Sequence, residues 1–374
     1  MRGMNDIDHD LIHVQRAADD LRRGLPVVVQ TTGDADGVPR ALLVLAAEFA
    51  NSGSLKFFDD IAADSFIMLT NNRALSLKVA GEDWPAVRIE RPDWMTPADI
   101  AAMADPTLDL ASPMKGPFTR IHHPSNDIDR AAIKLVKLAR LLPALVAAEI
   151  KDDPLDLLVD HDLSQAVAAD VLKTDLAQAA TLQQVASAHV PLASSEHTRL
   201  VSFRPLSGGV EHMAILIGDP PRGTSALARI HSECFTGDLL GSLKCDCGDQ
   251  LRGAIKAIEE AGGGVLLYMA QEGRGIGLVS KLKAYALQDQ GYDTVDANTR
   301  LGFDVDERIF APAAEMLKNL GFKSVRLMTN NPDKVAGLER YGITVSERVA
   351  HAFPANPHNE NYLATKKARS GHLL

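Results

Sequence analysis

Cysteine, aromatic residues and long apolar runs are all scarce in this chain. Its 374 residues include three cysteines and 5% Phe, Trp and Tyr. So few cysteines exclude a disulfide-based scaffold and fit a reducing compartment, so we expect a cytoplasmic protein. No apolar run approaches the about 18 residues that suggest a membrane span. The N-terminus carries Asp6, Asp8 and Asp10 and lacks the apolar core of a signal peptide.

Positive charge is also in short supply. The chain has 39 Lys and Arg against 49 Asp and Glu, a formal net charge of -10. We therefore expect no nonspecific binding of nucleic acid, and an anionic substrate would need a local group of basic residues. With 46% hydrophobic and 24% charged residues, the composition is that of an ordinary globular protein, and its length suggests at least two domains.

Apolar periodicity predicts helices and strands in both halves. In the first half we expect helices over 7–23 and 129–142, a strand over 25–30, an irregular, proline-rich stretch over 84–125, and a helix with a connector over 176–196. The second half alternates strands and helices. Its predicted strands are 199–204, 210–218, 226–231, 264–269 and 324–329, and its predicted helices are 249–261, 278–290, 311–320 and 333–341. Each of these helices is followed by a glycine, which favours helix termination there. The pattern predicts an α+β fold of two layered α/β-type domains, 1–190 and 191–374.

All three cysteines fall in one short run: Cys234, Cys245 and Cys247. Three thiolates without an obvious fourth protein ligand are typical of a catalytic zinc, which keeps one position for water. The alternative is that they are ordinary buried thiols. That alternative fits poorly, because a Cys-x-Cys pair cannot easily direct both sulfurs into one apolar core. Lys244 and Asp246 are also poor core neighbours.

Two strand-to-helix loops have the composition of anion sites. Gln271 to Gly277 is rich in glycine and contains Arg274, whose guanidinium suits phosphate. The alternative for this loop is an ordinary strand-to-helix turn without a ligand. Thr329 to Lys334 places a lysine in the first turn of a helix, against the helix dipole, which a nearby anion would explain.

From about residue 198 the sequence resembles GTP cyclohydrolase II. The matching strings are Arg-Ile-His-Ser-Glu-Cys at 229–234, Gly-Ser-Leu-Lys-Cys-Asp-Cys-Gly at 241–248, Gln-Glu-Gly-Arg-Gly-Ile-Gly-Leu at 271–278, Lys-Leu-Lys-Ala-Tyr-Ala-Leu-Gln-Asp at 281–289, Val-Asp-Glu-Arg at 305–308 and Thr-Asn-Asn-Pro-Asp-Lys at 329–334. The ending from Asn361 to Leu374 is also similar. The resemblance implies hydrolysis of GTP to a diaminopyrimidine, formate and pyrophosphate, the first step of riboflavin biosynthesis.

The resemblance also implies roles for individual residues. Cys234, Cys245 and Cys247 would hold one zinc, which acidifies the water that opens guanine at C8. Arg308 would attack the α-phosphorus, Asp306 would accept its proton, and Tyr285 would lie near C8. GTP-binding positions would be Arg229, Ile230, His231, Ser232, Glu233, Gln250, Glu272, Gly273, Arg274, Thr294, Thr329 and Lys334. We expect Mg²⁺ on the triphosphate, and a homodimer.

One stretch departs from the family pattern. After Val-Asp-x-Arg the family usually has Tyr-Gly-x-Gly-Ala-Gln, whereas this chain has Phe-Ala-Pro-Ala-Ala-Glu at 310–315. The change is either a variant with the same fold or an alteration of the guanine contacts or of the step at Arg308.

The first half weakly resembles 3,4-dihydroxy-2-butanone-4-phosphate synthase, over about 10–175. The synthase has an acidic loop where this chain reads Gly-Val-Pro-Arg-Ala-Leu at 37–42, and its metal-binding histidine aligns with Ile128. Glu149 alone remains of the site, and His122 and His123 stand at the wrong spacing. We therefore predict a degenerate, non-catalytic domain.

Two other functions stay open at this point. One is a paralogous enzyme that opens guanine nucleotides for another pathway, or stops at the formamide. The other is a zinc-stapled nucleotide-binding regulator without turnover.

Overall fold

The computed structural model describes residues 8–32, 39–62, 64–79, 84–113, 115–123, 125–151, 153–220, 225–351, 353 and 369. The chain folds into two compact units. Unit 1 comprises Met1–Thr174 and Val279–Glu307, and unit 2 comprises Asp175–Leu278 and Arg308–Leu374. Each unit contains one seven-stranded sheet, so the predicted α+β class with two layered domains is confirmed.

Unit 1 is built on a mixed sheet with strand order β5-β4-β3-β6-β2-β1-β7. Its strands are β1 Val27–Gln30, β2 Ala41–Ala46, β3 Ser65–Thr70, β4 Ala86–Glu90, β5 Arg120–Ile121, β6 Ala144–Ile150 and β7 Gln165–Val167. Its helices are α1 His9–Arg22, α2 Ser52–Ile61, α3 Asn71–Ser76, α4 Pro97–Ala104, α5 Asp127–Leu138, α6 Leu155–Asp160, α7 Ala168–Ala180, α9 Gly277–Asp289 and α10 Thr294–Arg300, of which α7 and α9 cross the unit boundary. Apolar residues of α1, α5 and α7 pack with one face of the sheet to form its core.

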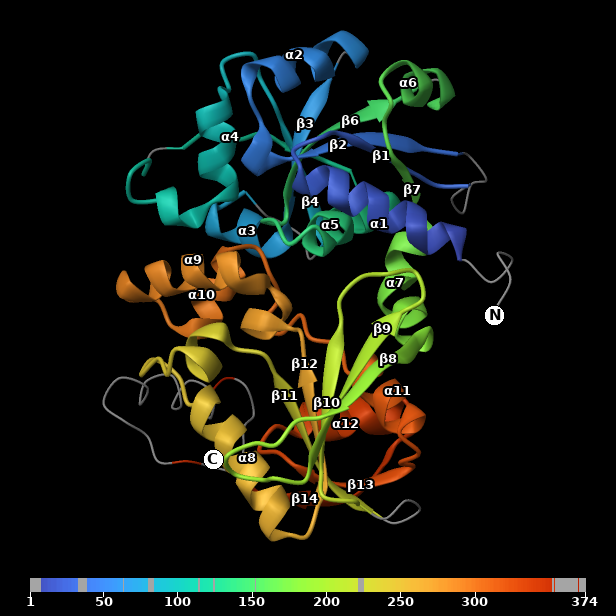
Figure 1. The fold of residues 1–374 in the computed structure, drawn as a ribbon. Coiled ribbons are helices and arrows are strands. Elements are labelled where there is room, and N and C mark those ends of the chain that lie inside the picture. Colours follow the sequence, from blue (N-terminus) through green and yellow to red (C-terminus); the bar gives the residue numbers. More distant parts are fainter. Residues whose placement is uncertain are drawn as a thin grey trace. The chain divides into compact units, whose positions relative to one another are not determined.

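Unit 2 contains the second sheet, in the order β14-β13-β11-β12-β10-β9-β8. Its strands are β8 Leu182–His189, β9 Thr198–Pro205, β10 His212–Ile217, β11 Ala226–Ser232, β12 Gly264–Met269, β13 Ser324–Met328 and β14 Thr344–Val349. Helices α11 (Ala311–Asn319) and α12 (Pro332–Arg340) pack in one core, and α8 (Cys247–Glu260) packs in another, and the two cores use alternate positions of the strands. Figure 1 shows these helices beside the second sheet. Strands β12, β11, β13 and β14 are parallel, so their carboxyl ends lie at one edge of the sheet.

The predicted helices and strands of the second half match this structure closely. The glycines at 262, 291, 321 and 342, after α8, α9, α11 and α12, all have positive φ, as helix-terminating glycines do. Two predictions for the first half were wrong. The stretch 84–125, predicted to be irregular, contains β4, α4 and β5, and the stretch 182–189, predicted as part of a helix and connector, is the edge strand β8. Seven of the eight residues of β8 are exposed, so it has no apolar periodicity by which a strand could be recognised.

None of the described helices is long and apolar enough to cross a membrane. The predicted boundary at residue 190 concerns homologous stretches of sequence and stays a prediction. The two compact units are defined by contacts in space and not by homology. In that division Val279–Glu307 belongs to the same unit as Met1–Thr174.

A buried histidine makes unit 2 sensitive to acid. His212 lies at the start of β10, and its Nδ1 accepts a hydrogen bond from the backbone N–H of Ala270 at 3.2 Å. Burial lowers the pKa of His212 to about 4, from 6.5. The unfolded chain therefore binds the extra proton more readily, and His212 contributes stability above pH 6.5 that is lost as the pH falls toward 4.

We expect the free energy of unfolding to fall between pH 7 and pH 5, with about 2 kcal/mol of that loss due to His212. His212→Gln keeps an acceptor for the Ala270 N–H but does not titrate, so it should remove this part of the loss. Urea unfolding of both proteins at pH 7, 6 and 5 measures the difference. Parallel pH profiles for the two proteins would contradict the assignment.

Candidate active site

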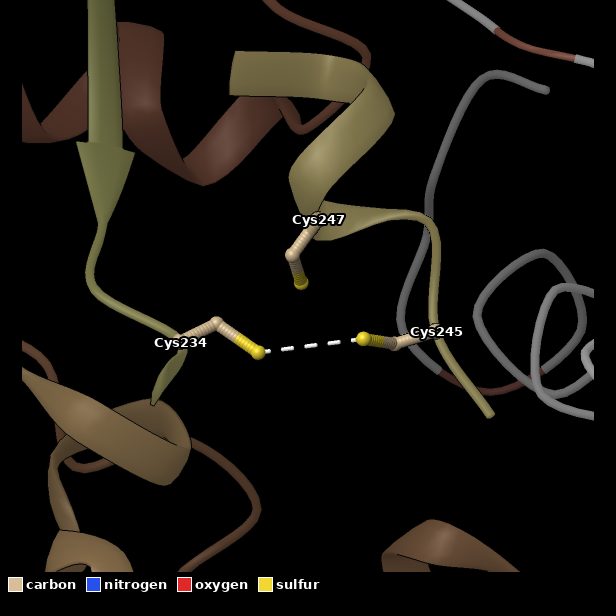
Figure 2. A group of neighbouring side chains, drawn as sticks. All are labelled: Cys234, Cys245 and Cys247. Atoms are coloured by element: carbon tan, nitrogen blue, oxygen red, sulfur yellow. Dashed lines mark hydrogen bonds between the residues drawn. The ribbon is translucent and has the colours of Figure 1, made fainter. Parts of the chain in front are cut away.

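Three thiols converge at the carboxyl edge of the second sheet. Cys234 follows β11, Cys245 lies in the connecting turn, and Cys247 begins α8. The sulfurs of Cys234 and Cys245 are 3.7 Å apart, and all three sulfurs lie within 4.8 Å of one another. Figure 2 shows the three side chains directed toward a common space. The predicted cysteine cluster therefore exists as a group that could hold a metal ion.

Gly237 forms one wall of this cluster. A Cβ atom built on Gly237 would lie 2.7 Å from the sulfur of Cys245, 3.1 Å from that of Cys234 and 2.9 Å from Cys247 Cβ. The backbone at Gly237 thus approaches the sulfurs more closely than any side chain allows. Glycine is needed at this position for space.

We expect Gly237→Ala to lower the metal content of the purified protein, because the new methyl group displaces the sulfurs. The matched control is Gly241→Ala in the same loop, where φ is +64° but no atom lies within 4 Å of an added Cβ. That control should cost about 1–2 kcal/mol of stability and leave the metal content unchanged. Metal analysis by mass spectrometry compares the two. Equal metal content in Gly237→Ala and wild type would contradict the requirement for glycine beside the sulfurs.

Asp238 connects the cysteine loop to the sheet. Its Oδ2 accepts hydrogen bonds from the backbone N–H of Cys234 at 3.0 Å and from the Tyr268 hydroxyl at 2.9 Å. The Nε2 atom of His231 lies 3.0 Å from the same oxygen, and the His231 and Tyr268 rings stack at 5.5 Å. Burial lowers the pKa of His231 despite the carboxylate, and burial, with Asp238, raises the pKa of Tyr268. Asp238 is not among the residues predicted from the sequence, because nothing in the sequence distinguishes it from the nearby Asp246 and Asp249.

The Gly-rich loop after β12, residues 271–277, also forms a hydrogen bond with the loop that contains the cysteines. Glu272 accepts a hydrogen bond from the backbone N–H of Phe235 at 2.7 Å and another from Gly273 at 2.8 Å. Gly273 and Arg274 both have left-handed backbones, with φ of 63° and 65°. Such a conformation strains a residue with a Cβ, and strain of this kind clusters at functional sites.

Two buried basic side chains, Arg229 and Lys334, lie near the carboxyl ends of the strands of the second sheet. Arg229 of β11 donates from Nη1 to the Met328 carbonyl at 2.8 Å and from Nη2 to Gln250 Oε1. Its Nε is buried, with no hydrogen-bond partner among the described residues. Burial lowers the pKa of Arg229 to about 10, so it stays charged at neutral pH. The buried Lys334 donates from Nζ to the Ile230 carbonyl at 2.7 Å. Positive charge therefore accumulates at the strand ends, as an anionic ligand requires.

The other predicted positions in unit 2 belong to the same strand ends. Arg308 Nη1 lies 3.4 Å from Ser232 Oγ, and its guanidinium is 5.9 Å from the Phe310 ring centre. Glu233 follows β11 and donates its backbone N–H to the Met269 carbonyl at 2.8 Å. Thr329 is buried just after β13, where its Oγ1 accepts from the Asn331 N–H.

Three predicted residues belong to unit 1. Tyr285 is half-buried on α9, with the ammonium of Lys281 at 5.8 Å from its ring centre. Thr294 begins α10, and Asp306 lies in the coil after that helix. Tyr285, Thr294 and Asp306 are therefore part of a different compact unit from the cysteines and Arg308.

The unusual segment 310–315 is part of a core. Phe310, Ala313 and Ala314 are buried among the apolar residues of unit 2, and Pro312 stands in the first turn of α11. A Cβ on Gly337 would lie 2.5 Å from the Phe310 ring, so α11 and α12 meet closely here. The departure from the family pattern thus replaces a tyrosine by a packed phenylalanine and two glycines by buried alanines, whereas its last residue, Glu315, stays polar and pairs with Lys318 at 2.7 Å.

Within residues 1–174, Glu149 is the carboxylate that remains from the synthase site, and it forms an ion pair with Arg88. Arg88 binds Glu149 at 2.5 Å and Asp129 at 2.7 Å, and its guanidinium lies 4.6 Å from the Phe66 ring centre. Although partial burial acts in the opposite direction, the hydrogen bond from Arg88 lowers the pKa of Glu149. Ile128 is buried in the core. Residues 37 and 38 of the replaced acidic loop lie outside the described residues, as do all but Arg369 of the tail at 361–374.

Comparisons with known proteins agree with these observations. The family model "GTP cyclohydrolase II" matches residues 183–350. The "GTP cyclohydrolase-2" of Azospirillum brasilense is 47% identical over 96% of this chain and 94% of its own length. The "Riboflavin biosynthesis protein RibBA" of Nocardia farcinica is 38% identical over 94% of this chain and 81% of its own. The "GTP cyclohydrolase-2" of an Enterobacter strain is 53% identical over 52% of this chain and 98% of its own.

A relative 47% identical and aligned over nearly its whole length leaves no ambiguity about descent. The matched region also contains the convergent cysteines and the basic strand ends. The chain belongs to the GTP cyclohydrolase II family.

Proposed function

We propose that this protein hydrolyses GTP to 2,5-diamino-6-(5-phosphoribosylamino)pyrimidin-4(3H)-one, formate and pyrophosphate, the first step of riboflavin biosynthesis. The observation that carries the proposal is the three-thiol cluster at the same strand ends as Arg229, Lys334 and Arg308. A metal can activate the water that hydrolyses the guanine ring, and fixed positive charge can stabilise the triphosphate of a nucleoside triphosphate.

We propose zinc as the metal of Cys234, Cys245 and Cys247. Two sulfurs at about 2.3 Å from a tetrahedral zinc lie about 3.8 Å apart, which compares with 3.7 Å between Cys234 and Cys245. The three thiolates would leave one position of a tetrahedral zinc open, and the metal would supply an acidified water there. Asp238 and Glu272 hold the backbone N–H groups of Cys234 and Phe235, so the ligand loop is ordered by its neighbours.

The remaining roles follow the family assignment. Arg308 attacks the α-phosphorus and breaks its bond to pyrophosphate, and Asp306 accepts the proton that the guanidinium must lose. Water then hydrolyses the new nitrogen–phosphorus bond, which releases the 5′-phosphate product and restores Arg308. Tyr285 orients the guanine near C8. Mg²⁺ accompanies the triphosphate. The GTP-binding positions of the family assignment are Arg229, Ile230, His231, Ser232, Glu233, Gln250, Glu272, Gly273, Arg274, Thr294, Thr329 and Lys334.

The direct test is to incubate the zinc-loaded protein with GTP and Mg²⁺. We expect formate, pyrophosphate and the diaminopyrimidine in equal amounts. Pyrophosphate release without formate would instead indicate a nucleotide hydrolase that leaves the ring closed. The absence of both products would overturn the proposal. We also propose that the protein is cytoplasmic, forms a homodimer and does not bind nucleic acid. Light scattering with and without DNA would check the last two of these proposals.

We expect the full chain to form no 3,4-dihydroxy-2-butanone 4-phosphate from ribulose 5-phosphate and Mg²⁺. Glu149 is bound to Arg88, and Ile128 offers no ligand where the synthase has a histidine. Without carboxylates for Mg²⁺ and for proton abstraction, the reaction has no base. An assay beside a preparation from cells with the empty vector measures the product. Magnesium-dependent turnover above that background would show that the N-terminal stretch is catalytic.

A further inference from the structure

The segment Val279–Glu307 is the part of the family region that packs in unit 1. It contains Tyr285, Thr294 and Asp306. Its neighbours in that unit come from residues 1–174, the N-terminal stretch, which we predict to lack the residues of the synthase reaction. The contacts between the two are specific and polar.

The first contact is at the end of β3. The hydroxyl of Thr70 donates to the carbonyl of Gly302 at 2.7 Å, and Thr70 is only 5% exposed. Gly302 has φ of +91°, and a Cβ there would lie 2.9 Å from both Thr70 Oγ1 and Pro143. The backbone of the segment therefore lies directly against the N-terminal stretch.

The second group of contacts surrounds the Asp306 position in the sequence. Asn72 Nδ2 donates to the Phe303 carbonyl at 2.9 Å and lies 3.3 Å from Asp304 Oδ1. Lys137 of α5 binds Glu307 at 2.6 Å and lies 3.6 Å from Asp304. Glu307 also accepts the backbone N–H of Asp304 at 2.8 Å. Anchors thus stand on both sides of the proposed proton acceptor.

The third contact fixes helix α9. Lys283 forms an ion pair with Asp105 and lies 3.6 Å from Glu48. Their side chains are between 14% and 24% exposed, so water screens these charges only partly. Lys283 is two residues from Tyr285 on the same helix.

We propose that the N-terminal stretch is a positioning scaffold for the catalytic segment, with Thr70, Asn72 and Lys137 as positioning residues for Asp306. The proposal rests on the proposed function. A proton acceptor must be held to within a fraction of an ångström, and a misplacement of about 1 Å can cost about 10²-fold in rate. The N-terminal stretch would then serve the reaction at Asp306 through these contacts.

The test compares Lys137→Met with Lys137→Arg in the full chain, with Lys56→Met as the control. Lys56 pairs with Asp60 on the exposed surface of α2. Among the described residues, no hydrogen bond or ion pair joins Lys56 to the segment. We expect Lys137→Met to lower kcat at least about tenfold with unchanged zinc content. Lys137→Arg keeps the charge and should stay within about threefold of wild type, and Lys56→Met should be unaffected.

Hydrogen exchange of the amides at 302–307 gives a readout independent of turnover. It should accelerate in Lys137→Met and in Asn72→Ala, and stay unchanged in Lys56→Met. Wild-type kcat in Lys137→Met, or a lower kcat without faster exchange, would overturn the scaffold role. If Lys137→Met fails to fold, Asn72→Ala supplies both measurements. If the wild type releases no formate, the proposed function fails, and hydrogen exchange alone still decides whether these residues hold the segment.

Discussion

Cys245→Ser protein is expected to contain little zinc and to release no formate from GTP. An alcohol is a much poorer zinc ligand than a thiolate, and two remaining thiolates do not retain the metal. The sulfur of Cys245 lies 3.7 Å from that of Cys234, so its loss removes a central member of the cluster. The fold should persist, since unit 2 has two apolar cores that do not depend on this side chain.

Zinc content by mass spectrometry and formate release at saturating GTP measure this prediction. The matched control is Leu243→Ala, an exposed position in the same loop, which should keep both zinc and activity. Full zinc occupancy with near-normal formate release in Cys245→Ser would refute the metal assignment.

Arg308→Ala is expected to lose pyrophosphate release by orders of magnitude while zinc content and fold remain. The guanidinium lies near Ser232 Oγ and the Phe310 ring, at the basic strand ends where we place the triphosphate. Asp306→Asn should be impaired at the same step, because an amide cannot accept the proton. An arginine that served only as a surface ion pair would be worth at most about 1 kcal/mol and would leave the rate intact.

Pyrophosphate release at saturating GTP distinguishes these possibilities. Arg326→Ala is the control, since Arg326 is a half-exposed arginine of the same unit paired with Glu347 at 2.6 Å. It should react at the wild-type rate. A loss below about tenfold, or about 1.4 kcal/mol of barrier, in both Arg308→Ala and Asp306→Asn would contradict their roles. The packed segment 310–315 would then be the first place to look for a different treatment of the triphosphate.

The sequence was most informative where chemistry restricts the choice of residue. The convergence of Cys234, Cys245 and Cys247 could be predicted because few structures other than a metal site use three thiols at such spacing. The strands and helices of the second half could be predicted because regular apolar periodicity coincides with terminating glycines. By contrast, β8 is an exposed edge strand and has no such pattern.

Asp238 and Gly237 could not be predicted for a different reason. Their importance depends on the bend of the loop after Cys234, which brings a carboxylate under a backbone N–H and a glycine against two sulfurs. No local sequence pattern encodes these contacts. The same holds for the anchors of 302–307, because Thr70, Asn72 and Lys137 are distant from that segment along the chain.

The path of the chain through its two units has a consequence for biosynthesis. Unit 1 begins at the N-terminus, but its last piece is Val279–Glu307, which follows 104 residues of unit 2 (175–278). Domains usually fold as units while the chain is synthesised from its N-terminus. Here the first unit to begin folding cannot be completed until residue 307 has left the ribosome. A ribosome that stalls before that point would hold a nascent chain in which Thr70, Asn72 and Lys137 lack the partners that residues 302–307 provide.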